Sequence, residues 1–189
     1  MPRLFTGIEL PPFLAEDLAD LAMPLAGAKW IEAQDMHITL RFAGDIDNPT
    51  ADEFHAALAT IDEPAFELRL SGFGAFGGQQ PRTLWAGVAE SPWLDTLARA
   101  CERAARSAGL PPEKHSFKPH VTMARLKGTR PESVARVLEQ LGSFVSEPFQ
   151  VERFALFSSR PKVGGGPYVI EDAFDLRGAD YAGAWAGGR

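Results

Sequence analysis

Two short segments of one pattern, HITL (residues 37–40) and HVTM (residues 120–123), constrain the fold of this chain more than any other feature. Each has a histidine, a threonine two residues later and apolar residues at the alternate positions, which is the period of a half-buried strand. The histidine and the threonine of each segment then share one face. A helix is predicted after both segments, so the chain carries an internal repeat, and we expect a two-lobed duplication.

The predicted elements follow one another in mixed order rather than in strict alternation of strand and helix. This order favours an α+β fold with antiparallel pairing. Together with the repeat, it predicts a bilobal, pseudo-two-fold duplication with two mainly antiparallel sheets, outer helices and a central cleft. The expected strands are 4–10, 30–31, 36–42, 66–70, 83–89, 120–126, 149–157 and 168–174, and the expected helices are 12–25, 50–61, 91–109 and 131–141. The expected N-cap of the second helix is Thr50, and that of the fourth is Thr129 or a residue near it.

The length and composition of the chain favour one domain. With 189 residues, 45% of them hydrophobic, it can bury one substantial core but is short for two domains of ordinary size. We expect a single bilobal domain over residues 1–189, monomeric, with a flexible glycine-rich tail from about residue 178. The net charge of −6 argues against binding nucleic acid along a broad basic surface, so an RNA substrate would be held only by a small part.

The sequence favours a cytoplasmic location without membrane attachment. The first residues lack the long apolar run of a secretory signal, and no stretch approaches the roughly 20 apolar residues that cross a bilayer. The single cysteine, Cys101, has no partner within the chain for a disulfide, and its place on the apolar side of a predicted helix favours a core role over that of a nucleophile.

Several other patterns are set aside on their context. GFGAFG at residues 72–77 matches a dinucleotide-binding pattern, but GQQPRT follows instead of a helix, so we interpret it as a turn between strands. The glycines at 164–166 lack the Lys-Ser or Lys-Thr of a phosphate-binding loop. The motif histidines are accompanied by threonine rather than by a further metal ligand, and neither His55, on a predicted helix surface, nor His115, in a loop, has the H-x-T setting.

A pair of such histidines suits the cleavage of a phosphodiester. One H-x-T in a strand is usually an accident of a half-exposed surface, but two copies 83 residues apart in matching settings favour function. Imidazole titrates near neutral pH, so one ring can act as the base on an attacking water and the other as the acid on a departing oxygen. The threonine hydroxyls can donate to non-bridging phosphate oxygens, which carry negative charge in the transition state.

The sequence resembles the two-histidine (2H) phosphoesterase superfamily, and within it the RNA 2',3'-cyclic phosphodiesterases, also called 2'-5' RNA ligases. The resemblance extends over nearly the whole chain, through RLFTGIELP, MHITLRFAGDID, GFGAFGGQQPRTLWAGV, FKPHVTMARLK and FALFSSRPKVGGGPYVI. Met123 stands where such proteins more often have leucine, a change of similar volume. The resemblance implies a bilobal fold with both motifs in a central cleft.

The resemblance also implies the reaction. Members cleave the bond from phosphorus to O3' of a 2',3'-cyclic phosphate and leave a 2'-phosphate, without a metal or other cofactor; the reverse reaction is 2'-5' ligation. Carried onto this chain, His37 is the proton donor, His120 is the proton acceptor, and Thr39 and Thr122 bind the phosphate. The division of acid and base between the histidines rests on the resemblance alone. The implied partners are RNA ends or nucleoside 2',3'-cyclic phosphates.

Four further residues are candidate substrate contacts. Arg41 shares the strand face of His37, whereas strict alternation puts Arg125 on the face opposite His120, so its contact requires a bulge or a strand end. Phe117 and Tyr168 are candidates to stack on a terminal base, with a core role equally open. Two alternatives to the RNA reaction also stay open, namely a phosphodiesterase acting on a small cyclic nucleotide or ADP-ribose-type metabolite, and a non-catalytic RNA-end binder.

Overall fold

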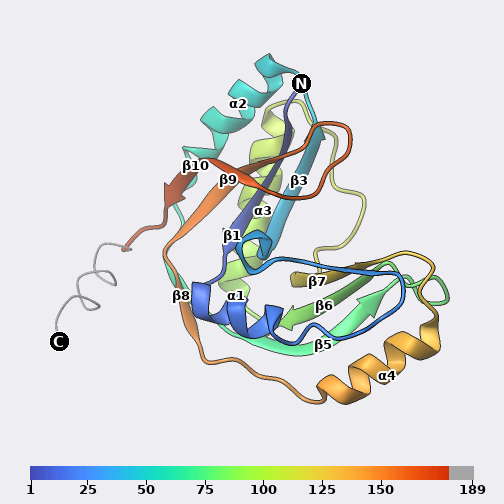
Figure 1. Cartoon of the computed structure of the whole chain (residues 1–189). Helices are drawn as coiled ribbons and strands as arrows, with labels where there is room; N and C mark the ends of the chain where they lie inside the picture. Colours follow the sequence, from blue (N-terminus) through green and yellow to red (C-terminus); the bar gives the residue numbers. More distant parts are fainter. Residues whose placement is uncertain (179–189) are drawn as a thin grey trace.

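The computed structural model describes residues 1–178 and contains, within that range, four α-helices and ten strands (Figure 1). In chain order the elements are β1 (Arg3–Glu9), α1 (Pro12–Ala19), β2 (Ala28–Trp30), β3 (His37–Asp45), α2 (Asn48–Leu58), β4 (Phe66–Leu68), β5 (Leu70–Phe76), β6 (Thr83–Val88), α3 (Pro92–Ser107), β7 (His120–Leu126), α4 (Pro131–Leu141), β8 (Phe149–Val151), β9 (Arg153–Ser159) and β10 (Val169–Asp175). A short 3-10 helix, Ala33–Asp35, precedes β3. The predicted tail lies outside the described residues, apart from Gly178.

The strands form one eight-stranded sheet and a small two-stranded one. The large sheet has the order β10-β9-β1-β3-β7-β6-β5, with β2 also paired to β7, and all of its named pairs are antiparallel. A single residue pair, Ile38 with Val121, joins β3 to β7. The sheet therefore consists of two four-stranded antiparallel halves that meet at the two motif strands, seen as the upper and lower strand groups of Figure 1.

The two halves repeat the same order of elements around this junction. In the first half β1 pairs with β3 and α1 lies between them in the chain, and α2 follows β3. In the second half β6 pairs with β7, α3 lies between them, and α4 follows β7. Helix α3 packs on β3 and against α2, while α4 packs on β5. The predicted α+β fold with a pseudo-two-fold duplication and mainly antiparallel sheets is confirmed.

The hydrophobic core lies on the sheet face opposite the motif histidines. Ile38 and Leu40 on β3 and Val121 and Met123 on β7 are buried, as their alternation with polar residues predicts. Cys101 is also fully buried in this core, and burial raises the pKa of its thiol to about 12, so it stays protonated. The prediction that this cysteine belongs to the core is confirmed.

Several predicted element ends differ from the structure. Helix α1 ends at Ala19 rather than near residue 25, because Pro24 lacks the N–H that a helix interior needs. The N-cap of α2 is Asp47, not Thr50: the Asp47 carboxylate accepts the Thr50 backbone N–H at 2.8 Å. The N-cap of α4 is Arg130, next to Thr129, whose hydroxyl instead donates to the carbonyl of Ala26 at 2.9 Å.

The predicted strand 66–70 is divided, and its two parts belong to different sheets. β4 pairs with β8 in the two-stranded sheet, while β5 begins at Leu70 and pairs with β6.

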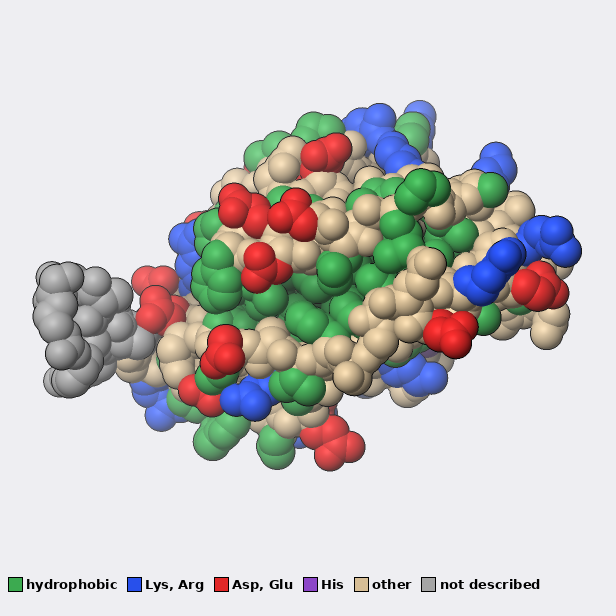
Figure 2. Space-filling model, turned by 60° about the horizontal axis from the view of Figure 1, so that its bottom comes forward, with side chains coloured by type: hydrophobic (Ala, Val, Ile, Leu, Met, Phe, Trp, Pro, Cys, Tyr) green, Lys and Arg blue, Asp and Glu red, His purple; other side chains and the backbone are tan. Residues whose placement is uncertain are grey.

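Within residues 1–178, no helix is both long enough and apolar enough to cross a membrane. Figure 2 shows one face of the molecule, on which hydrophobic side chains gather at the centre and basic side chains are scattered toward the margins, without a broad basic stripe.

Candidate active site

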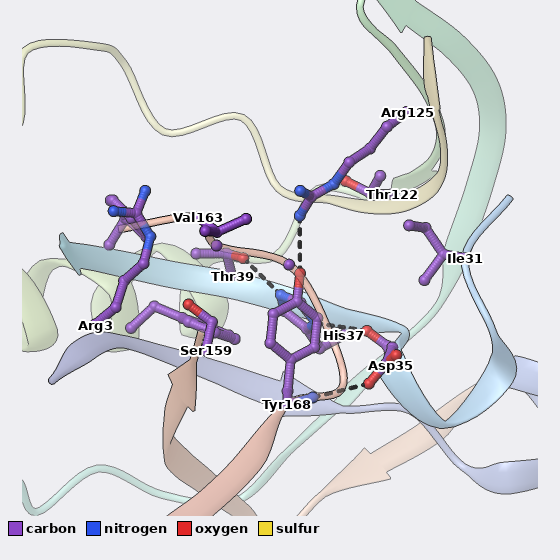
Figure 3. Close-up of a pocket in the computed structure, with 14 residues that line it drawn as sticks. Arg3, Ile31, Asp35, His37, Thr39, Thr122, Arg125, Ser159, Val163 and Tyr168 are labelled. Carbon is purple, nitrogen blue, oxygen red and sulfur yellow. Dashed lines mark hydrogen bonds between the residues drawn. The ribbon is translucent and has the colours of Figure 1, made fainter. Parts of the chain in front are cut away.

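A pocket of about 190 Å³ opens where the two halves of the sheet meet (Figure 3). Its walls come from both motif strands, from β1, from the 3-10 helix and from the segment between β9 and β10. The lining residues are Arg3, Phe5, Ile31, Asp35, His37, Thr39, Phe42, Thr122, Arg125, Ser159, Val163, Gly164, Gly165 and Tyr168. Both motifs therefore contribute to one cavity.

The pairing of Ile38 with Val121 orients the polar motif side chains. Residues directly opposite each other in an antiparallel pair point to the same face, and their neighbours along each strand point to the other face. Because Ile38 and Val121 face the core, the flanking histidines and threonines all lie on the opposite face, around the junction. The half-buried state of these four side chains and the burial of the residues between them agree with this alternation.

His37 lies against an aromatic wall in the pocket. Its ring centroid is 4.7 Å from that of Phe5, 5.6 Å from that of Phe157 and 5.0 Å from that of Tyr168. Its Nδ1 lies 2.9 Å from the carbonyl oxygen of Asp35, and its Nε2 lies 3.0 Å from the hydroxyl of Thr39 (Figure 3). A carbonyl only accepts, so Nδ1 carries the proton and Nε2 is the atom free to gain or lose one.

Burial lowers the pKa of His37 to about 4. The hydrogen bond to the Asp35 carbonyl opposes this shift, while the charge of Arg125 adds to it and the charge of His120 contributes further in the same direction. His37 is therefore a neutral imidazole near pH 7 when the pocket is free of substrate. An anion in the pocket favours the imidazolium and raises this pKa.

His120 repeats the arrangement of His37 in the other half. Its Nδ1 donates to the carbonyl of Lys118, two residues earlier, at 2.7 Å, so Nε2 is again the exchangeable position. Its ring meets that of Phe76 edge-on at 4.9 Å, and burial lowers its pKa below the ordinary value. His120 is not itself among the residues that line the cavity, whereas Thr122, on the same face of β7, is.

A bulge in β7 brings Arg125 into the pocket. In the pairing of β6 with β7, Trp85 is opposite Thr122 and Leu84 is opposite Ala124, so Met123 has no partner. The extra residue reverses the alternation, and Arg125 turns to the same face as Thr122. This is the bulge that a substrate contact by Arg125 requires. The Arg125 guanidinium donates to the Tyr168 hydroxyl at 2.8 Å.

A bulge at the corresponding place in β3 has the reverse effect on Arg41. Gly7 is opposite Thr39 and Thr6 is opposite Arg41, so Leu40 has no partner. Arg41 turns toward the core, only 7% exposed, and the prediction that it shares the face of His37 is wrong. It binds Glu102 on α3 and the carbonyls of Phe42 and Pro111. Phe42 takes the pocket position in its place.

The remaining candidates divide between the pocket and its surroundings. Tyr168 lines the pocket, and its backbone N–H donates to the Asp35 carboxylate at 3.0 Å. Phe117 is 37% exposed in the segment between α3 and β7 and does not line the cavity. His55 lies on the surface of α2, where its Nε2 is hydrogen-bonded to the Asp172 carboxylate at 2.6 Å, and His115 is exposed in a loop, as predicted.

Two charged pocket residues were missed by the sequence analysis. Arg3 pairs with Asp45 at 2.5 Å, and its guanidinium lies over the ring of Phe42, 4.9 Å from the centroid. Asp35 connects the histidine to the segment between β9 and β10, because its carbonyl binds His37 and its carboxylate binds the backbone of Tyr168. Asp35 precedes His37 by two residues, as Lys118 precedes His120, and in both cases the backbone carbonyl accepts from the histidine Nδ1.

Within residues 1–178, no three His, Cys, Asp or Glu side chains converge as a metal ion would require. The pocket instead offers two threonine hydroxyls, the guanidinium of Arg125 and an imidazole whose Nε2 exchanges a proton. These groups can bind a singly or doubly charged oxyanion and transfer protons to and from it.

The sequence is similar to a known protein family and to curated proteins of several organisms. The sequence profile of a family described as the 2'-5' RNA ligase superfamily matches residues 10–162. An RNA 2',3'-cyclic phosphodiesterase of Aeropyrum pernix is 37% identical over 132 residues, which are 68% of this chain and 73% of the relative. A protein of the same name from Thermus thermophilus is 30% identical over 188 residues, which are 93% of this chain and 91% of the relative.

Solved structures share the fold. A crystal structure of a Thermus thermophilus protein has a TM-score of 0.75 at 27% identity, with 93% of this chain and 98% of that chain covered. The crystal structure of E. coli LigT complexed with 3'-AMP has a TM-score of 0.72 at 24% identity, with the same two coverages. At that identity the second likeness concerns the fold alone.

Proposed function

The chain belongs to the 2'-5' RNA ligase superfamily, and from this membership and the geometry of the pocket we propose that it hydrolyses 2',3'-cyclic phosphates at RNA ends to 2'-phosphates. The observation that carries the proposal is the junction of β3 and β7. Around the Ile38–Val121 pair, two H-x-T segments present their polar side chains on one face beside one cavity. A single phosphate is the substrate that such a convergence of donors and proton-transfer groups suits.

In the proposed reaction, water attacks phosphorus while the bond from phosphorus to O3' breaks. His120 Nε2 takes the proton from the attacking water, and His37 Nε2 gives a proton to the departing O3'. The product retains the phosphate on O2'. After the product leaves, His120 releases its proton to solvent and His37 takes one up from solvent. The enzyme is therefore unchanged after one turnover.

The side chains around the histidines support the charge changes in this reaction. The hydroxyls of Thr39 and Thr122 donate to the non-bridging oxygens, where negative charge increases as the water adds. Arg125 supplies the positive charge of its guanidinium, which the Tyr168 hydroxyl orients by accepting one of its N–H groups. No step requires a metal ion, since acid, base and charge stabilisation are all assigned to side chains.

The low pKa of His37 makes its role as acid depend on the substrate. In the free protein the buried ring is neutral near pH 7. The negative charge of a bound cyclic phosphate next to Nε2 stabilises the imidazolium, so substrate binding and proton uptake by His37 are coupled. The same groups support 2'-5' ligation, in which His120 deprotonates an RNA 5'-hydroxyl that attacks the cyclic phosphate in place of water, the bond from phosphorus to O3' breaks, and His37 protonates O3'.

To test this proposal, the purified protein is incubated with adenosine 2',3'-cyclic phosphate in excess EDTA, and the product is identified by phosphorus NMR. We expect adenosine 2'-phosphate, formed at an unchanged rate after the chelator is added. Formation of only the 3'-phosphate would exclude cleavage at O3'. A rate that recovers only when Mg²⁺ or Mn²⁺ is restored would exclude the metal-independent mechanism.

A further inference from the structure

Two arginines converge on one glycine at the edge of the pocket. Gly165 lines the cavity, and the guanidinium groups of Arg125 and Arg160 each come within 3.4 Å of the point where a side chain on Gly165 would begin. The two guanidinium nitrogens concerned are therefore at most twice that distance apart. Two positive charges at such a separation repel each other, and an anion between or beside them relieves the repulsion.

Neither arginine has an ion-pair partner in the part of the chain that the structure describes. Among residues 1–178, neither Arg125 nor Arg160 forms an ion pair with Asp or Glu, and the one side-chain hydrogen bond of Arg125 is donated to the uncharged Tyr168 hydroxyl. The other pocket arginine is different, because Arg3 is paired with Asp45 at 2.5 Å. The cations of the pocket region that form no ion pair within this range thus lie beside Gly165, while the Asp35 carboxylate lies beside the next residue, Gly166.

The two arginines have different positions relative to the cavity. Arg125 lines the pocket beside Thr122, where the cyclic phosphate is proposed to bind. Arg160 is exposed and is not among the lining residues, so it lies at the rim. A nucleoside 2',3'-cyclic phosphate has one negative charge, which Thr122 and Arg125 already face. An RNA end has a second, namely the phosphate that joins its last two nucleotides.

We propose that Arg160, next to Arg125, binds the phosphate between the last two nucleotides of the substrate, so that the enzyme prefers an oligonucleotide with a cyclic end to a mononucleotide. This inference rests on the proposed function and adds to it a second phosphate site, at Arg160, that distinguishes RNA ends from mononucleotides. Binding a second phosphate at the rim also agrees with the net charge of −6, since only one local cluster of cations is required.

The experiment compares kcat/KM for three substrates, which are uridine 2',3'-cyclic phosphate, the dinucleotide with the same cyclic end, and that dinucleotide with a neutral methylphosphonate linkage. The wild-type protein should prefer the charged dinucleotide to the mononucleotide by about tenfold, and the neutral linkage should remove most of this preference. Arg160→Gln should reduce the preference about fivefold or more, and Arg160→Lys should retain part of it.

Lys162→Gln is the matched control, because it removes one positive charge from the same segment. Lys162 does not line the pocket, is not among the residues nearest to a side chain on Gly165, and donates its backbone N–H to Asp45. This variant should keep the wild-type preference. Arg3→Gln tests the other pocket arginine, and the preference should survive this change as well.

The outcomes separate the subsite from the reaction. If Arg160→Gln leaves the preference unchanged, or if Lys162→Gln or Arg3→Gln removes it equally, the assignment of the second phosphate to Arg160 is overturned while the hydrolysis stands. The same assignment is overturned if the wild-type protein prefers the dinucleotide with the neutral linkage over the mononucleotide as strongly as it prefers the charged dinucleotide. If the wild-type protein cleaves none of the three substrates, the proposed function itself fails.

Discussion

Ile38 and Val121 are directly opposite each other in the sheet, and each immediately follows a motif histidine. Because this is the one residue pair between β3 and β7, the pseudo-two-fold relation of the halves passes through it. Their side chains are fully buried in the core. The same contact therefore contributes to the stability of the junction and turns both histidines to the opposite face, which connects the hydrophobic core to the proposed chemistry.

Replacing either motif histidine should abolish most of the activity. His37→Ala and His120→Ala should each lower kcat by about a thousandfold or more, because each removes one of two proton-transfer groups that act together. The double variant should be little worse than either single one. Steady-state hydrolysis of a cyclic-ended dinucleotide measures this. His55→Ala and His115→Ala, outside the pocket, should stay within about twofold of wild type, and a comparable loss in either would contradict the assignment.

The pH dependence of kcat/KM should have an acidic optimum. Burial lowers the pKa of His37 to about 4 and that of His120 below its ordinary value of 6.5, and kcat/KM reports the free protein. Protonated His37 and neutral His120 coexist most often at pH values between the two pKa values. We therefore expect kcat/KM to fall as the pH rises above about 6.5. The optimum of kcat should lie higher, because bound phosphate raises the pKa of His37. A kcat/KM that still rises between about pH 7 and 9 would contradict this account.

Stability should depend on pH through the same buried ring. The folded protein binds the His37 proton only near pH 4, whereas the unfolded chain binds it near pH 6.5, so the unfolded state holds more protons between these values. This contribution to stability is complete above about pH 6.5 and is lost as the pH falls toward 4. Between pH 7.5 and pH 5 it amounts to about 2 kcal/mol in the free energy of unfolding.

Denaturant unfolding of His37→Gln at these two pH values checks this prediction. The variant lacks the titrating group, so its free energy of unfolding should fall less with acid than that of the wild type. Equal losses in the two proteins would mean that His37 titrates normally in the folded state.

The arginines after the two motifs should have opposite roles. Arg41→Met removes a buried guanidinium that binds Glu102 and two carbonyls, and should lower the free energy of unfolding by about 2 kcal/mol or more, since these acceptors lose their partner. Arg125→Met should change stability by less than about 0.5 kcal/mol but reduce kcat/KM about a hundredfold. Thermal unfolding and steady-state kinetics on both variants separate the two effects, and the reverse pattern would contradict the two bulges.

The sequence predicted those parts of the fold that depend on local pattern. β7 and α4 begin and end at the predicted residues, 120–126 and 131–141, because a short apolar strand that starts with alternation and a Pro-initiated amphipathic helix are local signals. The face shared by His37 and Thr39, and by His120 and Thr122, also follows from alternation alone.

The parts that were missed depend on partners far away in the chain. The bulges at Leu40 and Met123 arise in the pairing with β1 and β6, and alternation along one strand contains no sign of them. They decide that Arg125 enters the pocket and that Arg41 leaves it. Arg3 joins the site only because β1 folds beside β3, and the Asp35 carboxylate binds Tyr168 only because the segment between β9 and β10 folds over β3, which no local pattern reveals.

The most direct test of the account is a crystal structure of the protein with uridine vanadate, whose trigonal-bipyramidal vanadium imitates the phosphorus of the reaction. We predict that His37 Nε2 and His120 Nε2 lie at about 2.7–3.2 Å from two different vanadate oxygens on opposite sides of the metal, with Thr39 and Thr122 bound to the others. Vanadate bound elsewhere, or one imidazole turned away from it, would contradict the central claim that both histidines act on one phosphate.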